Sequence, residues 1–146
     1  MERVNTAGKR LIPLCLMAIS IVLMALPYGV RVGFANPEGS PFIHHYSYFS
    51  TIPMGYANIF PIITVIATIV VTIIIVVKIS KRAESGFIYG KAEFIFLGIC
   101  IAASLLSWIL FNAISIIGVI VFILHDAALA LGIINNKQQK NNKAEA

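Results

Sequence analysis

The residues best suited to chemistry are His125 and Asp126, which are adjacent in the apolar stretch VIVFILHDAALALGII. Asp126 lies eight residues before Ile134, where the apolar run ends, and this separation is about 12 Å along a helix. An ionisable pair at that depth in a bilayer is expensive, and it is by default a functional-site hypothesis. Because neighbouring side chains on a helix point about 100° apart, the two residues need different partners.

His125 shares a helical face with Gly118, Ala128 and Gly132, and small residues on one face indicate contact with another helix. Asp126 instead shares a face with Ser115, Phe122 and Ala130. Polar side chains at comparable depths in the other apolar stretches are expected to complete one polar layer inside a bundle. These side chains are Ser20, Thr68, Thr72, Cys100 and Ser104.

Two interpretations of the polar residues stay open. In the first, Asp126 with His125 nearby serves a proton- or cation-coupled step. In the second, which we favour, they form a structural lock between helices, because a transporter normally has more than one membrane-embedded acid, base or broken helix. No other carboxylate lies in a predicted span. The intramembrane polar candidates are His125, Asp126, Ser104, Thr68 and Thr72.

Other signals for catalysis or metal binding are weak. His44 and His45 are adjacent, and adjacent residues in an extended chain point to opposite faces, so they cannot easily chelate one metal ion together. The chain has no Gly-rich phosphate loop, C-x-x-C, H-E-x-x-H or G-x-S-x-G motif. We therefore predict no catalytic residue, no metal and no cofactor. Glu84 and Glu93, which a membrane-embedded lipid enzyme would need, are expected to be solvated among lipid headgroups.

Membrane helices must position these residues. The chain has 146 residues, of which 59% are hydrophobic and 12% charged, whereas a soluble domain carries about 25% charged residues. The deficit leaves too little polar surface to cover a globule, but several stretches are long enough to cross about 30 Å of hydrocarbon. The predicted fold class is an all-α membrane protein, a single-domain bundle of four transmembrane helices.

The apolar stretches place the elements of this bundle. Helices are expected at about residues 11–30, 56–77, 94–111 and 114–134, an outer loop at 31–55, a cytoplasmic loop at 78–93 and a disordered tail at 135–146. The turn between the last two helices is placed near Phe111-Asn112-Ala113. The first helix also resembles a signal peptide, but its apolar run is longer than a usual signal core, so we expect it to stay uncleaved.

Small and sulfur-containing residues inside these helices predict how the helices pack. Gly98 with Ala102, and Ala128 with Gly132, form two small-xxx-small pairs that favour close helix contact. Cys15 and Cys100 both fall in apolar stretches. They are expected to be buried, unreactive thiols.

The distribution of charge predicts the topology. Ten of the eleven Lys and Arg fall in segments 1–10, 78–93 and 135–146, and Arg31 alone lies on the other side. By the positive-inside rule, both termini are cytoplasmic and the protein is a multi-pass plasma-membrane protein. The basic charge is split among three segments without interleaved aromatics, so it indicates contact with the lipid bilayer and not with nucleic acid. Arg31 against Glu38 leaves the outer loop neutral, which argues against capture of charged ligands by field alone.

The outer loop carries the most distinctive sequence. NPEGSP at 36–41 is strong turn chemistry, and apolar residues alternate with polar ones on both sides. This pattern predicts a β-hairpin, and an irregular, partly helical cap is the alternative. Four of the five tyrosines fall in this region, either as interface anchors or as a partner surface. The partner-surface candidates are His44, His45, Tyr46, Tyr48 and Tyr56.

The strings LPYGVRVGFANPEG and YSYFSTIPMGYANIFP resemble small uncharacterised four-helix membrane proteins of low-GC bacteria, over roughly residues 26–64. The resemblance implies the same topology in a bacterial membrane and implies no activity. We expect a non-enzymatic scaffold or accessory subunit that presents its outer loop to a protein partner, with homo-oligomers also possible. The alternatives are a small proton- or cation-coupled transporter or channel using Asp126, and a membrane-embedded lipid enzyme.

Overall fold

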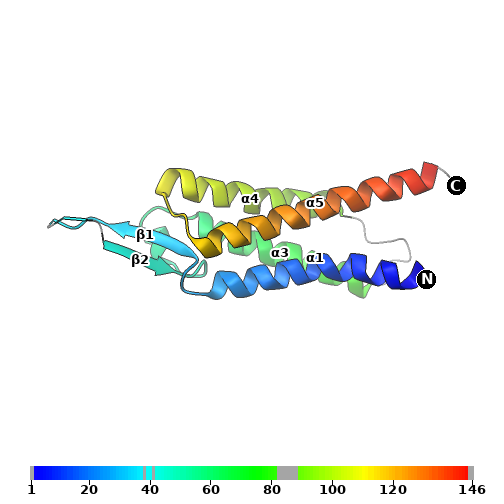
Figure 1. Ribbon diagram of the computed structural model, residues 1–146, viewed down its shortest axis with the longest axis horizontal. Coiled ribbons are helices and arrows are strands. Elements are labelled where there is room, and N and C mark those ends of the chain that lie inside the picture. Colours follow the sequence, from blue (N-terminus) through cyan, green and yellow to red (C-terminus); the bar gives the residue numbers. More distant parts are fainter. Residues whose placement is uncertain (1, 38, 41, 82–88, 145–146) are drawn as a thin grey trace.

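The computed structural model describes residues 2–37, 39–40, 42–81 and 89–144. Four long helices lie side by side, a two-stranded hairpin projects from one end, and both termini lie at the other end (Figure 1). In chain order the elements are α1 (Glu2–Ala25), β1 (Val30–Phe34), β2 (Phe42–Tyr46), α2 (Ile52–Gly55), α3 (Phe60–Ser80), α4 (Lys91–Phe111) and α5 (Ile116–Ala144).

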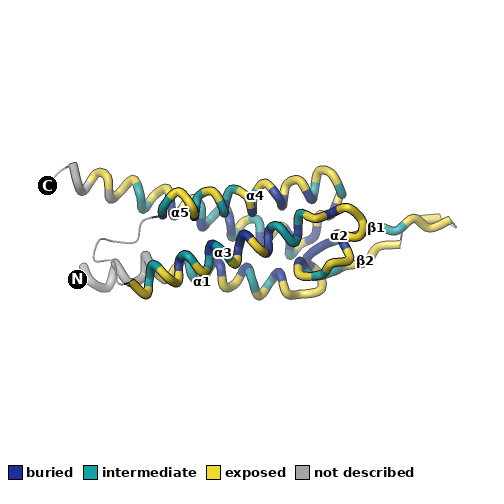
Figure 2. Tube along the Cα trace, turned by 180° about the vertical axis from the view of Figure 1, so that it is seen from behind, coloured by how far each residue is buried: buried dark blue, intermediate teal, exposed yellow. Residues whose placement is uncertain are grey.

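The four long helices form a closed ring. α1 packs against α3 and α5, and α4 also packs against α3 and α5. α3 and α5 are therefore diagonal partners across the bundle, as are α1 and α4. Buried residues follow the inner faces of the helices, and exposed residues follow the outer faces (Figure 2). The outer surface of the bundle includes many large apolar side chains, which suits a bundle surrounded by hydrocarbon.

Three of the helices are long and apolar enough to cross a membrane: Phe60–Ser80, Lys91–Phe111 and Ile116–Gln138. α1 contributes a shorter apolar stretch, Leu11–Ala25. The protein is thus mostly helical, with three long apolar helices, a shorter one and a small sheet. This architecture is consistent with the predicted helical membrane protein.

Prolines explain why two helix boundaries differ from the predicted ones. The first helix was expected to run to residue 30, but α1 ends at Ala25, because the residue before Pro27 disfavours helical geometry. The second was expected to start at residue 56, but α3 starts at Phe60. Pro61 then falls in the first turn, where its missing N–H costs little. The third helix starts slightly earlier than expected, at Lys91.

The prediction of a disordered tail at 135–146 is wrong for its described part, because α5 continues to Ala144. Once a helix is nucleated, each added residue gains a backbone hydrogen bond at low cost. The start of the tail is also fastened to the bundle. Asn136 Oδ1 accepts the N–H of Tyr89 at 3.1 Å, and its Nδ2 donates to the Tyr89 carbonyl at 2.9 Å.

The turn between α4 and α5 is confirmed at the predicted place. α4 ends at Phe111, and Asn112 adopts the left-handed conformation with φ 48°. Asn is one of the few residues besides Gly that adopt this conformation readily. A turn without Gly or Pro is therefore possible here.

The predicted β-hairpin is confirmed, and a short helical segment follows it. β1 and β2 are antiparallel, with Phe34 opposite Phe42 nearest the turn and Val30 opposite Tyr46 at the base. α2 lies between the hairpin and α3. The outer region thus combines both conformations that the sequence allowed. Since a lone hairpin is marginal in water, contacts with the bundle must hold it.

The two small-residue pairs have different roles. Ala128 and Gly132 are buried inside the bundle, as predicted. Ala102 instead is exposed, and a Cβ added at Gly98 would meet nothing within 4 Å. A Cβ added at Gly132 would overlap the buried ring of Tyr89. Gly132 therefore makes the recess in α5 that receives this ring.

The Tyr89 recess gives a matched pair of substitutions. Gly132→Ala is expected to lower the free energy of unfolding by about 1–3 kcal/mol through overpacking, although Ala favours a helix by about 1 kcal/mol over Gly. Gly98→Ala, which faces open space, is expected to be neutral or stabilising. Unfolding in detergent micelles measures both. Equal effects of the two substitutions would contradict this packing of Tyr89.

Candidate functional site

A polar layer crosses the middle of the bundle between two apolar clusters. We call the end of the bundle that carries the termini the inner end and the end that carries the hairpin the outer end. The cluster nearer the inner end includes Met17, Val71 and Leu97. The cluster nearer the outer end includes Met24, Val65 and Val121. Each of the four long helices contributes one fully buried polar or thiol side chain between them. These residues are Ser20 of α1, Thr68 of α3, Cys100 of α4 and His125 of α5. Of the residues that the sequence analysis assigned to a polar layer, Ser20, Thr68 and Cys100 therefore lie in it together with His125.

A hydrogen bond between diagonal helices centres the layer. His125 Nε2 lies 2.9 Å from Thr68 Oγ1. Thr68 Oγ1 also donates to the Thr64 carbonyl at 2.7 Å, and a hydroxyl has only one proton to give. The imidazole must then donate from Nε2–H, which leaves a lone pair on Nδ1. That atom is buried and has no hydrogen-bond partner among the described residues.

The thiol of Cys100 completes the contacts around Thr68. Its Sγ lies 3.5 Å from Thr68 Oγ1 and 3.7 Å from the Thr64 carbonyl. Cys100 is buried as predicted, but Cys15 is exposed on the outside of α1. Ser20 donates to its own helix, to the Leu16 carbonyl at 2.9 Å. The layer thus links α3, α4 and α5 through side chains, while α1 only fills it.

The other two hydroxyl candidates do not bond to His125. Thr72 donates back to the Thr68 carbonyl at 2.7 Å, which is the usual bond of a hydroxyl within its own helix. Ser104 is buried one turn along α4 from Cys100, and its Oγ has no partner among the described residues. Both residues lie near the layer, and neither adds a contact between helices.

Asp126 lies outside the polar layer, although it was one of the intramembrane polar candidates. Its side chain points away from that of His125, because neighbouring side chains on a helix point about 100° apart. It is partly exposed and has no hydrogen bond or ion pair with the rest of the described chain. It follows Phe122 by one turn, and the Phe122 ring contacts Trp108 of α4 at 5.0 Å between centroids. Asp126 therefore lies on the flank of α5 beside α4, and His125 and Asp126 do not form one site.

The geometry of the layer supports a structural role better than a chemical one. The Thr68 hydroxyl is committed to a backbone carbonyl, so His125 does not activate it as a base activates a nucleophile. No group of three or more His, Cys, Asp or Glu that could hold a metal ion occurs in the described part of the chain. A single buried polar contact in an apolar bundle fixes the register of its helices.

At the inner end, Glu93 is a buried helix cap that sequence reasoning missed. It was expected to be solvated, but it is 1% exposed. Its Oε1 forms an ion pair with Lys78 at the end of α3, and its Oε2 accepts the Gly90 N–H at 3.0 Å. A carboxylate in the first turn of a helix also favours the helix dipole. The signal for this role was Glu at the third position of α4. Glu84 lies outside the described residues.

At the outer end, two residues fasten the hairpin to the bundle. Ser115 Oγ donates to the Gly29 carbonyl at 2.5 Å and accepts the Gly118 N–H at 2.9 Å, so it caps α5 and holds the base of β1. Tyr48 N–H donates to the Met24 carbonyl at 3.0 Å. The Tyr48 side chain is 4% exposed, and burial raises its pKa to about 12. Tyr48 is therefore a packing residue and does not belong to an exposed partner surface.

The other partner-surface candidates are accessible. His44 and His45 are exposed on opposite faces of the hairpin, as predicted. His44 packs edge-on against Phe42 and near Tyr46, with ring centroids 4.5 Å and 6.1 Å away. Tyr56 is exposed and makes an edge contact with Phe34 at 5.0 Å. The rings on one side of the hairpin form a continuous aromatic face, which consists of Phe34, Phe42, His44, Tyr46 and Tyr56.

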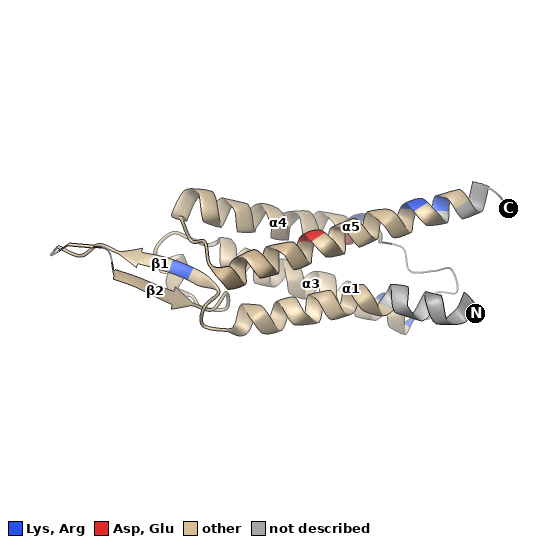
Figure 3. Ribbon diagram, viewed as in Figure 1, with Lys and Arg blue, Asp and Glu red and all other residues tan. Residues whose placement is uncertain are grey.

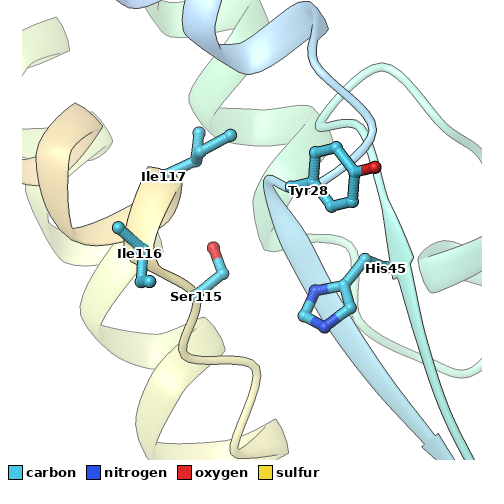
Figure 4. Close-up of a pocket in the computed structure, with 5 residues that line it drawn as sticks. All are labelled: Tyr28, His45, Ser115, Ile116 and Ile117. Atoms are coloured by element: carbon cyan, nitrogen blue, oxygen red, sulfur yellow. The ribbon is translucent and has the colours of Figure 1, made fainter.

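Two pockets flank the base of the hairpin. The first, of about 360 Å³, is apolar and lies between the hairpin and the start of α5. Tyr28 and His45 form one wall of it, and Ser115, Ile116 and Ile117 form the other (Figure 4). The second, of about 210 Å³, lies between β1, the segment before α3 and the end of α4. Its lining includes Arg31, Tyr56 and Asn58.

Comparisons with models of protein families, with curated proteins and with solved structures find no match. The functional interpretation therefore rests on the residues of this chain and on their geometry.

The bond between Thr68 and His125 is testable by a double-mutant cycle. Thr68→Val keeps the shape and leaves the buried imidazole N–H unpaired, so we expect a loss of about 1–3 kcal/mol in the free energy of unfolding. Thr68→Val with His125→Leu removes both partners and is expected to cost less than the sum of the single changes. Thr72→Val is the control, because its hydroxyl bonds only within α3. Equal effects of Thr68→Val and Thr72→Val would contradict the bond.

The buried phenol of Tyr48 predicts a pH dependence. Its pKa near 12 lies above the 10.0 of a free phenol, so its stabilising contribution is complete below pH 10 and is lost as the pH rises from 10 to 12. This loss amounts to about 2–3 kcal/mol. Absorbance of phenolate in the wild type minus Tyr48→Phe is expected to rise near pH 12. A rise near pH 10 would show that Tyr48 is solvated.

Proposed function

We propose that the protein is a small multi-pass membrane protein without catalytic activity, and that it presents its outer hairpin to a protein partner. The observation that carries the proposal is the hairpin itself, which projects past the helices (Figure 1). Several of its aromatic side chains are exposed. Phe42 is 60% exposed and Tyr56 is 55% exposed. Exposed aromatic clusters mark interaction sites, and aromatic residues are common binding hot spots.

The anchoring of the hairpin supports recognition by a preformed surface. Ser115 and Tyr48 bind the base of the hairpin to the ends of α5 and α1. A surface that is already ordered loses less conformational entropy on binding. A tether for spacing or a flexible linker would not need these buried bonds.

The placement of charge supports a bundle with cytoplasmic termini and an outer hairpin. Apart from Arg31 in β1, the described Lys and Arg residues lie at the end of the bundle that carries the termini (Figure 3). This asymmetry is the one that orients membrane proteins. α1 spans with the others in this proposal, because it contributes Met17 to the inner apolar cluster and Met24 to the outer one. Its 15 apolar residues, Leu11–Ala25, extend about 22 Å, and flanking residues complete the span.

The transporter and lipid-enzyme alternatives have less support. A coupled pathway would bring Asp126 and His125 together, and they lie on different faces of α5. A lipid enzyme would need polar groups free at the headgroups, and Glu93 is engaged as a cap by Lys78 and Gly90. We therefore favour presentation of the hairpin, because it accounts for the exposed aromatic residues of the hairpin and these alternatives do not.

A single cysteine in the hairpin turn tests display and partner together. Ser40→Cys and Lys140→Cys, each in a Cys15→Ala background, are treated in intact cells with a membrane-impermeant, thiol-reactive photo-crosslinker. Ser40→Cys is expected to react and, on illumination, to give one discrete protein adduct. Lys140→Cys is expected to react only after permeabilisation.

The controls separate the two parts of this proposal. Phe42→Glu added to Ser40→Cys keeps the reactive thiol and is expected to abolish the adduct, because a carboxylate replaces the exposed ring. Reaction of Lys140→Cys in intact cells would refute the topology. Reaction of Ser40→Cys without a discrete adduct, or an adduct that survives Phe42→Glu, would refute presentation of the aromatic face.

A further inference from the structure

The smaller of the two outer pockets has the composition of a binding site for a small polar ligand. It has a volume of about 210 Å³ and lies between β1, the segment that leads into α3, and Phe111 at the end of α4. That volume equals about seven water molecules at roughly 30 Å³ each, and it is below the roughly 300–1,000 Å³ of pockets for drug-sized ligands.

Asn58 lines this pocket with an unsatisfied acceptor. The side chain is 3% exposed, and its Nδ2 donates to Ser107 Oγ of α4 at 3.0 Å. Its Oδ1 has no hydrogen-bond partner among the described residues. A buried amide oxygen without a donor costs about 1–3 kcal/mol. A ligand that brings an O–H or N–H group to this oxygen would recover that cost.

Arg31 brings a positive charge to the same pocket. It is the only Lys or Arg between Leu11 and Val77, and the described part of the chain offers it no ion pair. The guanidinium binds carboxylate or phosphate oxygens with two parallel hydrogen bonds. This pairing acts at contact distance, so binding here does not need a net positive field over the outer loop.

We propose that this pocket binds a small phosphate-bearing group that also carries a hydroxyl, as a glycerophosphate does. Its phosphate pairs with Arg31, and its hydroxyl donates to Asn58 Oδ1. The group comes either from a free molecule or from the headgroup of phosphatidylglycerol, because the pocket opens at the end of the apolar helices. Tyr56 lines this pocket and also belongs to the exposed aromatic face. The proposal nevertheless does not depend on the protein partner of the hairpin, since the two ligand-binding groups, Arg31 and Asn58, are not part of that face.

The test uses purified protein in phosphatidylcholine nanodiscs. Glycerol 1-phosphate is titrated by calorimetry, and nanodiscs that contain phosphatidylglycerol are analysed by native mass spectrometry for lipid retained after delipidation. Arg31→Gln is expected to weaken binding of the true ligand by about tenfold or more. Asn58→Asp, which preserves the shape and places a second negative charge beside the phosphate, is expected to weaken it similarly.

Lys81→Gln is the matched control, because it removes the same charge at the inner end of the bundle and is expected to leave binding unchanged. Arg31→Lys keeps the charge and is expected to bind better than Arg31→Gln, which rules out loss of binding through misfolding. Saturable glycerol 1-phosphate binding that depends on Arg31 would identify a free ligand, and retention of phosphatidylglycerol alone would identify a lipid. Absence of both, or equal effects of Arg31→Gln and Lys81→Gln, would overturn the proposal.

Discussion

The hydrogen bond between His125 and Thr68 joins the two diagonal helices α3 and α5 through the centre of the bundle. Apolar packing above and below this layer is non-directional and tolerates small shifts between helices. A buried imidazole tolerates far less, since an unpaired polar group in apolar surroundings costs several kcal/mol. The bond thus selects one register of the helices. That register also places Gly132 of α5 where the Tyr89 ring needs space, and Ser115 where the base of the hairpin needs a donor.

Both ends of the bundle are held in the same way, by a buried polar side chain that binds backbone groups or a charged side chain. At the inner end Glu93 holds Lys78 and the first turn of α4. At the outer end Ser115 caps α5 and binds the chain entering β1. Helix ends are costly in an apolar setting because their terminal N–H and C=O groups lack partners. Side chains that bind these terminal groups also bind the segments next to the helices, so the helix ends and the neighbouring loops are held together. The hairpin is in this way an ordered extension of the bundle.

The functional residues divide between two regions of the protein. The centre contains buried polar residues whose hydrogen bonds, such as that between Thr68 and His125, are made within the bundle, which suits a structural role. The outer end contains exposed rings, such as Phe42 and Tyr56, and a pocket with an unpaired amide oxygen and an arginine. Both of our proposals therefore place the recognition of other molecules at the outer end. Asp126 stands apart from both, because it is a carboxyl group on the flank of α5 with no partner in the described chain.

The sequence alone determined the mostly helical fold with four long helices, the turn at Asn112 and the hairpin around NPEGSP. These features follow from local rules: the length of apolar runs, turn chemistry, and the fixed periods of helix and strand. The tertiary structure decided which side chains meet. That Thr68 faces His125 from a helix 57 residues away, that Tyr48 and Glu93 are buried, and that Arg31 and Asn58 share a pocket all depend on how the helices rotate and align. One sequence pattern is compatible with many such alignments, and only the buried polar bonds between elements choose among them.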